Sequence, residues 1–287
     1  SPPWDPNARK NHISYAWPDS LLKNSKGKEI GFLMPAIHGG RELLQICNPR
    51  KRKKEKLAVN WQFLHVTAMN VASLIEKLHQ AGYILGDIKP QNILVNNQAL
   101  PSIIDTDSFQ VRDSLTGRIY RCPVASENYT PPELLGKDIS TIIQNESHDH
   151  FRLAVLIYCL LFSTDTPFKG EWMGKGDSAS PSELIKQGWW PYASSGLIQA
   201  GSSTMPLGIV SKELSDCFLS AFNQGHQQPN ARPSAQEWKQ ALKRAYRQLR
   251  ECNVKTLHFY SPRWGKCYWC QREQQLGVDI FYGQRKP

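Results

Sequence analysis

The chain has 287 residues, 40% of them apolar and nine of them tryptophan, which favours a globular protein of one large domain or two smaller ones. Its seven cysteines are mostly scattered, no targeting segment is visible at the beginning, and the longest apolar run, Leu153–Phe162, is about half as long as a membrane span. These features argue against a secreted disulfide scaffold and a membrane protein, so we expect a cytoplasmic protein.

The first part of the chain predicts a loop followed by two strands. Residues 1–11 are rich in Pro and Asn and predict a loop. The runs Ile13–Trp17 and Glu29–Met34 predict two short strands, separated by a polar turn at Asn24–Lys28.

Much of the excess positive charge, formally +10 over the chain, lies in the run Arg50–Lys56. Such a run can bind nucleic acid or an acidic partner. No aromatic side chains alternate with these charges, so we favour a solvated loop or helix start and expect no nucleic-acid partner.

The clearest helix is predicted over Leu57–Gln80, and it should end at Ala81-Gly82. Apolar residues recur there at alternating steps of four and three, which places them on one stripe of a helix. The residues of this stripe are Leu57, Trp61, Leu64, Ala68, Val71, Ile75 and Leu78. We expect the stripe to lie in the core and not to form a binding face.

Polar residues cluster beside two short apolar strands, Ile93–Val95 and Ser102–Ile104. Three of them precede the first strand and two follow the second: Asp87, Lys89, Asn92, Asp105 and Asp107. A hairpin would bring two acids and an Asn together, and such oxygen ligands suit Mg²⁺ that is shared with nucleotide phosphates. A Lys beside a potential base would neutralise a transferring phosphoryl group.

Further helices are expected downstream. An apolar helix opens at Asp149 and runs to Phe162, and two more are predicted over Ser211–Phe222 and Ala235–Cys252. The segment 110–130 is polar and loop-like, and residues 170–208 show little periodicity and indicate no chemistry.

The stretch Gly82–Val111 resembles the catalytic and metal-binding loops of bacterial-type Ser/Thr protein kinases. The family's Asp-x-x-x-x-Asn spacing is met by Asp87 and Asn92, and Asp105 lies at the distance expected for the metal-binding Asp. Leu85-Gly86 replaces the family's His-Arg, and Asp105-Thr106-Asp107 replaces Asp-Phe-Gly. Because that Arg normally answers a phosphate on the activation loop, this mode of control is in doubt.

Three motifs further along also resemble those of protein kinases: Tyr129–Glu133, Asp149–Val155 and Ala231–Ser234. Tyr129-Thr130-Pro131-Pro132-Glu133 is similar to the Ala-Pro-Glu ending of an activation segment, whose Glu pairs with a buried Arg, here Arg232. Asp149–Val155 is similar to Asp-x-Trp-x-Leu-Gly, whose Asp caps the catalytic-loop backbone. Asp149 is therefore expected to be structural.

The resemblance implies a function and roles for the residues. A Mg·ATP-dependent Ser/Thr protein kinase would use Asp87 to orient and deprotonate the protein substrate's hydroxyl and Lys89 to steady the γ-phosphate. Asn92 and Asp105 would hold Mg²⁺. ATP would be bound at the gatekeeper Met34, along the hinge Pro35–Ile37, with Ile37 at its end, and over Leu94.

Two other functions remain open. The chain has no match to the Gly-rich phosphate loop, the strand Lys or its partner Glu, so it either starts partway through a longer protein or is a pseudokinase that acts as a regulatory or scaffold module. The start at Ser1 favours the first explanation. A small-molecule phosphotransferase, similar to aminoglycoside or choline kinases, would explain Gly86-Asp87 and Asp105-x-Asp107 but not Glu133 and Arg232.

The end of the chain carries a separate signal for zinc. The candidate ligands are Cys252, His258, Cys267 and Cys270. A Cys-x2-Cys pair grips one Zn²⁺ tetrahedrally, and four protein ligands close a structural site. Buried cysteines or a redox-active dithiol are the alternative.

The predicted fold is α+β and protein kinase-like, with a mainly helical large lobe. We expect a partial small lobe over residues 1–35, the large lobe over 36–250 and a small zinc-ribbon-like element over 251–287.

Overall fold

The computed structural model describes residues 3–164 and 166–286. Its helices are α1 (Leu43–Cys47), α2 (Pro49–Lys54), α3 (Trp61–Gln80), α4 (Glu146–Phe162), α5 (Pro181–Gln187), α6 (Lys212–Leu219), α7 (Gly225–Gln227), α8 (Ala235–Gln248) and α9 (Tyr268–Leu276). Its strands are β1 (Ser20–Lys23), β2 (Glu29–Leu33), β3 (Arg41–Glu42), β4 (Ile93–Val95), β5 (Pro101–Ile103), β6 (Val111–Arg112), β7 (Ile119–Tyr120), β8 (Glu171–Trp172), β9 (Ile198–Gln199), β10 (Arg250–Glu251) and β11 (Phe259–Tyr260).

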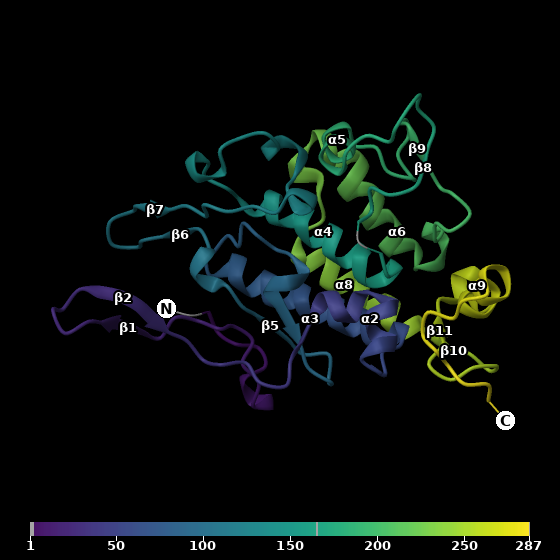
Figure 1. The fold of residues 1–287 in the computed structure, drawn as a ribbon, viewed down its shortest axis with the longest axis horizontal. Helices are drawn as coiled ribbons and strands as arrows, with labels where there is room; N and C mark the ends of the chain where they lie inside the picture. Colours follow the sequence, from purple (N-terminus) through teal and green to yellow (C-terminus); the bar gives the residue numbers. More distant parts are fainter. Residues whose placement is uncertain (1–2, 165, 287) are drawn as a thin grey trace.

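The core lies between α3, α4 and α8, which occupy the centre of the molecule (Figure 1). The predicted apolar stripe of α3 is buried from Trp61 to Leu78. The helix begins four residues later than predicted because the Asn60 side chain accepts a hydrogen bond from the Phe63 N–H at 2.7 Å and so caps its first turn. Leu57, the first residue of the predicted stripe, lies before the helix and is only half-buried.

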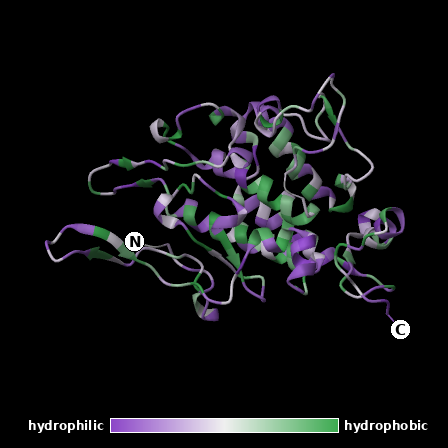
Figure 2. Ribbon diagram, in the orientation of Figure 1, coloured by the Kyte–Doolittle hydropathy of each residue, from purple (hydrophilic) through white to green (hydrophobic). Residues whose placement is uncertain are grey.

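Helix α4 is buried along nearly its whole length, and hydrophobic residues gather on these central helices (Figure 2). Its rings form an aromatic cluster with α6 and the turn after it: Tyr158 stacks on Phe162 at 4.2 Å and meets Phe218 edge-on at 5.2 Å between ring centroids. Close aromatic packing of this kind makes the centre of the molecule rigid.

Strands β3, β4 and β5 form a small antiparallel sheet beside the central helices. Strand β4 has its predicted bounds, and β5 begins one residue earlier than predicted. In the pairing, Ile93 lies opposite Ile103, and Leu94 lies opposite Ser102. The hairpin therefore brings the polar residues that precede β4 close to those that follow β5.

The prediction of a strand at Ile13–Trp17 is wrong. The strand that pairs with β2 is β1, and the two form a hairpin that extends away from the helices (Figure 1). The segment around Tyr15 instead makes an isolated bridge with Ile103, and the Tyr15 hydroxyl donates to the Leu74 carbonyl at 3.1 Å. Tyr15 and Ala16 are buried there, whereas Ile13 is exposed.

Two of the predicted downstream helices differ from the structure near their ends. After α6 the backbone widens into a π-helical turn at Ser220–Gln224, so the predicted helix Ser211–Phe222 is not uniform. Helix α8 begins as predicted, with a capping box between Ser234 and Glu237, but ends at Gln248, because Arg250–Glu251 pairs with β11.

The basic run forms helix α2, and most of its charges are exposed. Arg52 is the exception, since only 1% of it is accessible. Its guanidinium donates to the carbonyls of Ile46 at 3.2 Å and Ile280 at 3.0 Å, and burial lowers its pKa to about 10. Of the helices in residues 3–164 and 166–286, none combines the length and the apolar character that crossing a membrane requires.

Candidate active site

The loop that carries Asp87 is hydrogen-bonded through its backbone to Asp149, near the beginning of α4. The carboxylate of Asp149 is fully buried and accepts from the backbone N–H of Leu85 at 2.8 Å and of Gly86 at 3.0 Å. His79 and Arg152 also contact it, at 3.0 and 3.2 Å. These four contacts offset the burial of the charge, and the pKa of Asp149 is lowered although burial alone raises it. The expected structural role of Asp149 is confirmed.

Gly86 explains one departure from the resemblance in physical terms. It lies in the left-handed region at φ 73°, and a Cβ built on it would lie 2.5 Å from the sulfur of Cys122. Cys122 belongs to the segment between β7 and Glu133 and is fully buried. An arginine at this position would displace that segment, so a glycine allows the close contact.

The residues predicted for catalysis come together at the edge of the β4–β5 hairpin. Lys89 Nζ lies 2.5 Å from Asp87 Oδ2, and the side chain of Asp87 is only 2% exposed. Asn92 Nδ2 donates to the Asp87 carbonyl at 3.1 Å and to Asp105 Oδ2 at 3.3 Å. Among the described residues, Asp87 Oδ1 is buried without a hydrogen-bond partner. Asp87 Oδ1 can therefore accept a hydrogen bond from a further donor.

Asp105 has an unusual backbone and an unfavourable electrostatic environment. It adopts φ 63° and ψ 35°, which is uncommon for a residue other than glycine. Partial burial and the charges of Asp107 and Asp87 raise its pKa, while Ser108 and Lys89 oppose the rise. Carboxylates gathered in this way favour a cation.

Of the four residues expected at the adenine, Leu94 lies in β4, and Ile37 lies close to Gly40, which contacts Leu94. Leu94 is half-buried in β4, and Gly40 approaches it so closely that a Cβ added to Gly40 would lie 2.9 Å from Leu94 Cβ, which fixes the chain next to it. Ile37 lines a hollow of about 310 Å³ together with His12 and other residues. Met34 is exposed, and Pro35 is half-buried.

The predicted pairing of Glu133 with Arg232 is confirmed. Arg232 donates from Nη1 at 2.6 Å and from Nη2 at 2.8 Å to the two oxygens of Glu133, a bidentate pair. Arg232 also donates to the Gly225 and Ser147 carbonyls. Burial raises the pKa of Glu133, but the hydrogen bonds and charge of Arg232 outweigh it, so the pKa is lowered.

The partners that hold the candidate residues in place were not predicted from the sequence. His79 and Arg152 hold Asp149, and Asp279 contacts His258 at 3.0 Å. His79 lies in the last turn of α3, shortly before the loop that carries Asp87. This position could have indicated from the sequence that His79 lies near that loop. Asp279 has no local pattern around it that distinguishes it from a surface acid.

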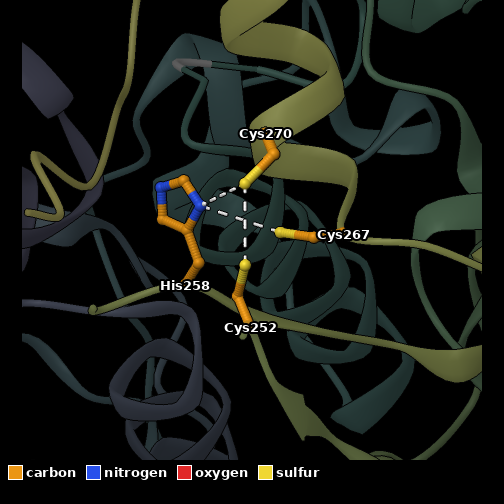
Figure 3. Close-up of side chains that lie close together, drawn as sticks. All are labelled: Cys252, His258, Cys267 and Cys270. Atoms are coloured by element: carbon orange, nitrogen blue, oxygen red, sulfur yellow. Dashed lines mark hydrogen bonds between the residues drawn. The ribbon is translucent and has the colours of Figure 1, made fainter. Parts of the chain in front are cut away.

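The four residues predicted for zinc lie together at the far end of the molecule from the β1–β2 hairpin (Figure 1). Their sulfur and nitrogen atoms all lie within 4.8 Å of one another, and Figure 3 shows them pointing toward a common centre.

Comparison with known proteins identifies the family. A family model described as Protein kinase domain matches residues 24–243. Protein kinase YegI of Escherichia coli (strain K12) is 30% identical over 273 residues, covering 93% of this chain and 41% of its own. A probable serine/threonine-protein kinase of Dictyostelium discoideum is 34% identical over 160 residues, covering 56% of this chain and 21% of its own. This chain spans about two-fifths of the length of the bacterial relative. The predicted kinase-like α+β fold is confirmed, and the chain belongs to the protein kinase domain family.

Proposed function

We propose that this chain carries the catalytic site of a Ser/Thr protein kinase, which transfers the γ-phosphate of ATP to a hydroxyl group of a protein. The observation that carries the proposal is the convergence of Asp87, Asn92 and Asp105 at one edge of the β4–β5 hairpin. The choice of Ser/Thr over Tyr rests on Lys89, two residues after Asp87, which is typical of Ser/Thr kinases.

The donor set fits Mg·ATP. Asp105 and Asn92 supply carboxylate and amide oxygens, which are hard ligands suited to Mg²⁺. Burial and the charges of Asp107 and Asp87 raise the pKa of Asp105, and a cation beside its carboxylate would offset both effects. When bound, Mg·ATP supplies the transferable phosphoryl group and the cation that neutralises part of its charge. Met34, Pro35, Ile37 and Leu94 are proposed to contact the adenine.

The remaining steps fall to Asp87 and Lys89. Asp87 Oδ1, which has no partner among the described residues, would accept the proton of the substrate hydroxyl. Lys89 now neutralises Oδ2 of the same carboxylate and is 27% exposed, so it can reach a phosphate that enters from solvent. The Asp149 contacts keep the loop rigid during this exchange.

We propose a division of the chain to match this function: part of a small lobe over residues 1–35, the large lobe over 36–250 and an appended element over 251–287. A pseudokinase is the second candidate, favoured by Gly86 and by Thr106-Asp107 in place of the usual kinase residues. A small-molecule phosphotransferase is disfavoured, because the Glu133–Arg232 pair belongs to the protein kinase pattern.

The test is Mg·ATP binding by calorimetry together with phosphate transfer to Ser/Thr peptides. These are compared for the wild type, Asp105→Asn and Asp216→Asn, whose carboxylate forms an exposed pair with Lys212. We expect Asp105→Asn to abolish Mg²⁺-dependent transfer while the circular dichroism spectrum is retained, and Asp216→Asn to behave as wild type. Binding without transfer, insensitive to Asp105→Asn, would establish the pseudokinase instead.

A further inference from the structure

The side chains of Cys252, His258, Cys267 and Cys270 are spaced as a tetrahedral metal site requires (Figure 3). The two sulfurs of Cys252 and Cys270 are 3.6 Å apart. His258 Nδ1 lies 3.4 Å from the sulfur of Cys270 and 3.7 Å from that of Cys267. Zinc bond lengths place neighbouring sulfurs about 3.8 Å apart and a sulfur and nitrogen about 3.6 Å apart around one tetrahedral ion. The observed spacings match these values.

The local fold brings the four ligands together in two pairs. Cys252 and His258 lie at the two sides of the turn that joins β10 to β11, and the Cys252 N–H donates to the His258 carbonyl at 2.9 Å. Cys267 caps the beginning of α9, and Cys270 lies in its first turn. The Val254 N–H donates to the sulfur of Cys252 at 3.3 Å.

The histidine is oriented by the carboxylate of Asp279, which is largely shielded from solvent. His258 is fully buried, and its Nε2 contacts Asp279 Oδ1 at 3.0 Å, which directs Nδ1 toward the three sulfurs. Asp279 in turn accepts from Lys255 at 3.1 Å and from the backbone N–H groups of Phe281 and Gly283 at 2.8 and 3.1 Å. Ligating histidines are commonly held in this way through their second nitrogen.

We propose that Cys252, His258, Cys267 and Cys270 form a structural zinc centre, with Asp279 as a positioning residue. Three thiolates and one imidazole suit Zn²⁺, and four protein ligands leave no open coordination position for a reaction. A redox-active dithiol would use two of the cysteines and would leave the buried third cysteine and the directed histidine without a purpose. Binding releases the thiol protons as the thiolates coordinate the ion.

The centre fixes the C-terminal segment, defined here as residues 250–286, against the large lobe. Trp269, next to the ligand Cys270, packs edge-on against Trp61 at 5.1 Å and against Phe281 at 4.8 Å between ring centroids. Arg52 lies 5.0 Å from the Phe281 ring and donates to the Ile280 carbonyl. Because Trp269 precedes the ligand Cys270 and Ile280 and Phe281 follow Asp279, occupancy of the metal site would stabilise these contacts with the rest of the molecule.

Metal analysis of the full chain, purified without added metal, tests the proposal. We expect about one zinc per chain in the wild type. We expect loss of the zinc in Cys270→Ser and its retention in Cys217→Ser, a partly buried cysteine outside the cluster. Because Cys270→Ser could fail to fold, the wild type is also loaded with Co²⁺ after removal of zinc, and ligand-field bands of a tetrahedral thiolate site are expected.

Asp279→Asn tests the positioning role separately. It keeps all four ligands, and we expect a 10–100-fold weaker zinc affinity in competition with a chelator, with about one zinc still bound at saturation. Unchanged affinity would overturn the role of Asp279. Metal-free wild type with a disulfide between Cys252 and Cys270, or zinc retained equally in Cys270→Ser and Cys217→Ser, would overturn the centre itself.

Discussion

The ion pair of Glu133 with Arg232 ties the end of the activation segment to the beginning of α8. The side chain of Arg232 is fully buried, whereas that of Glu133 is 25% exposed. Glu133→Gln would leave the buried guanidinium without its charged partner, and we expect a loss of about 2–3 kcal/mol in the free energy of unfolding. Urea denaturation at pH 7 measures this loss. The exposed pair Lys212–Asp216 is the control, and Asp216→Asn should cost about 0.5 kcal/mol or less.

The pH dependence of this pair has a defined sign. The pKa of Glu133 is lowered in the folded protein relative to its usual value, so ionised Glu133 contributes stability above the unfolded-state pKa. That contribution is lost as the pH falls through the folded-state pKa. The difference in stability between wild type and Glu133→Gln should therefore shrink in acid. If the difference in stability between wild type and Glu133→Gln stays constant down to the acid transition, then packing and not charge accounts for the stabilising effect of Glu133.

At the scale of elements, the activation segment depends on the contact between Gly86 and Cys122. Gly86→Ala would combine left-handed backbone strain with an overlap of Cβ with the sulfur of Cys122 at 2.5 Å. We expect it to lower stability by about 2–4 kcal/mol and to speed proteolytic cleavage between β6 and β7, where Leu115 is exposed. Thermal melts and limited proteolysis measure the two effects.

Gly136→Ala is the matched control for this substitution. Gly136 has φ 75°, and a Cβ added there would meet no atom within 4 Å, so the control keeps the backbone strain and removes the overlap. We expect a cost of about 1 kcal/mol and an unchanged cleavage rate. Equal effects of the two substitutions would mean that the Gly86–Cys122 contact does not hold the segment.

The elements show which features the sequence predicts and which it does not. The apolar stripe of α3 and the run of β4 are local patterns, and both were predicted closely. The segment Ile13–Trp17 has the same alternation as a strand, but tertiary contacts with Ile103 and Leu74 decide its structure. Intrinsic strand preference is weak enough to be overridden by such packing.

In the candidate sites, too, residues in local patterns could be predicted, whereas a residue placed by tertiary contacts could not. Asp87, Asn92 and Asp105 could be predicted because their spacing along the chain is short and the hairpin between them is local. The clustering of Cys252, His258, Cys267 and Cys270 could be predicted because a Cys-x2-Cys pair with a further Cys and His nearby indicates a shared site. Asp279 could not, since its contact with His258 spans 21 residues and depends on the folded C-terminal segment.

At the scale of the whole molecule, the net charge does not indicate what the residues of the basic run contact. The charge is formally +10, but Arg52 is removed from the surface to bind the Ile280 carbonyl, and Lys53 lies 5.3 Å from the Tyr282 ring. The basic run therefore forms part of the surface against which the C-terminal segment packs. Arg52 and Lys53 therefore have structural contacts, whereas the other basic residues of the run are exposed.

Trp61 of α3 contacts both α4 and α9, so its substitution tests whether these three helices unfold together. Its Nε1–H donates to the Leu161 carbonyl of α4 at 2.8 Å, and its ring contacts Trp269 of α9. Trp61→Phe would leave that carbonyl unsatisfied and weaken the contact with α9, at a cost of about 1–3 kcal/mol. Trp4→Phe, at an exposed tryptophan, should cost nothing measurable.

The cooperativity of unfolding is followed by two probes in the same denaturant series. Circular dichroism reports chiefly the central helices α3, α4 and α8, and thiol labelling of Cys267 and Cys270 reports the C-terminal segment. Because Trp61 contacts both parts, we expect the two transitions to coincide in wild type and to shift by the same amount in Trp61→Phe. If labelling precedes the loss of helix in wild type, the segment unfolds independently, and its contacts with Trp61 and Arg52 are too weak to couple it to the kinase lobe.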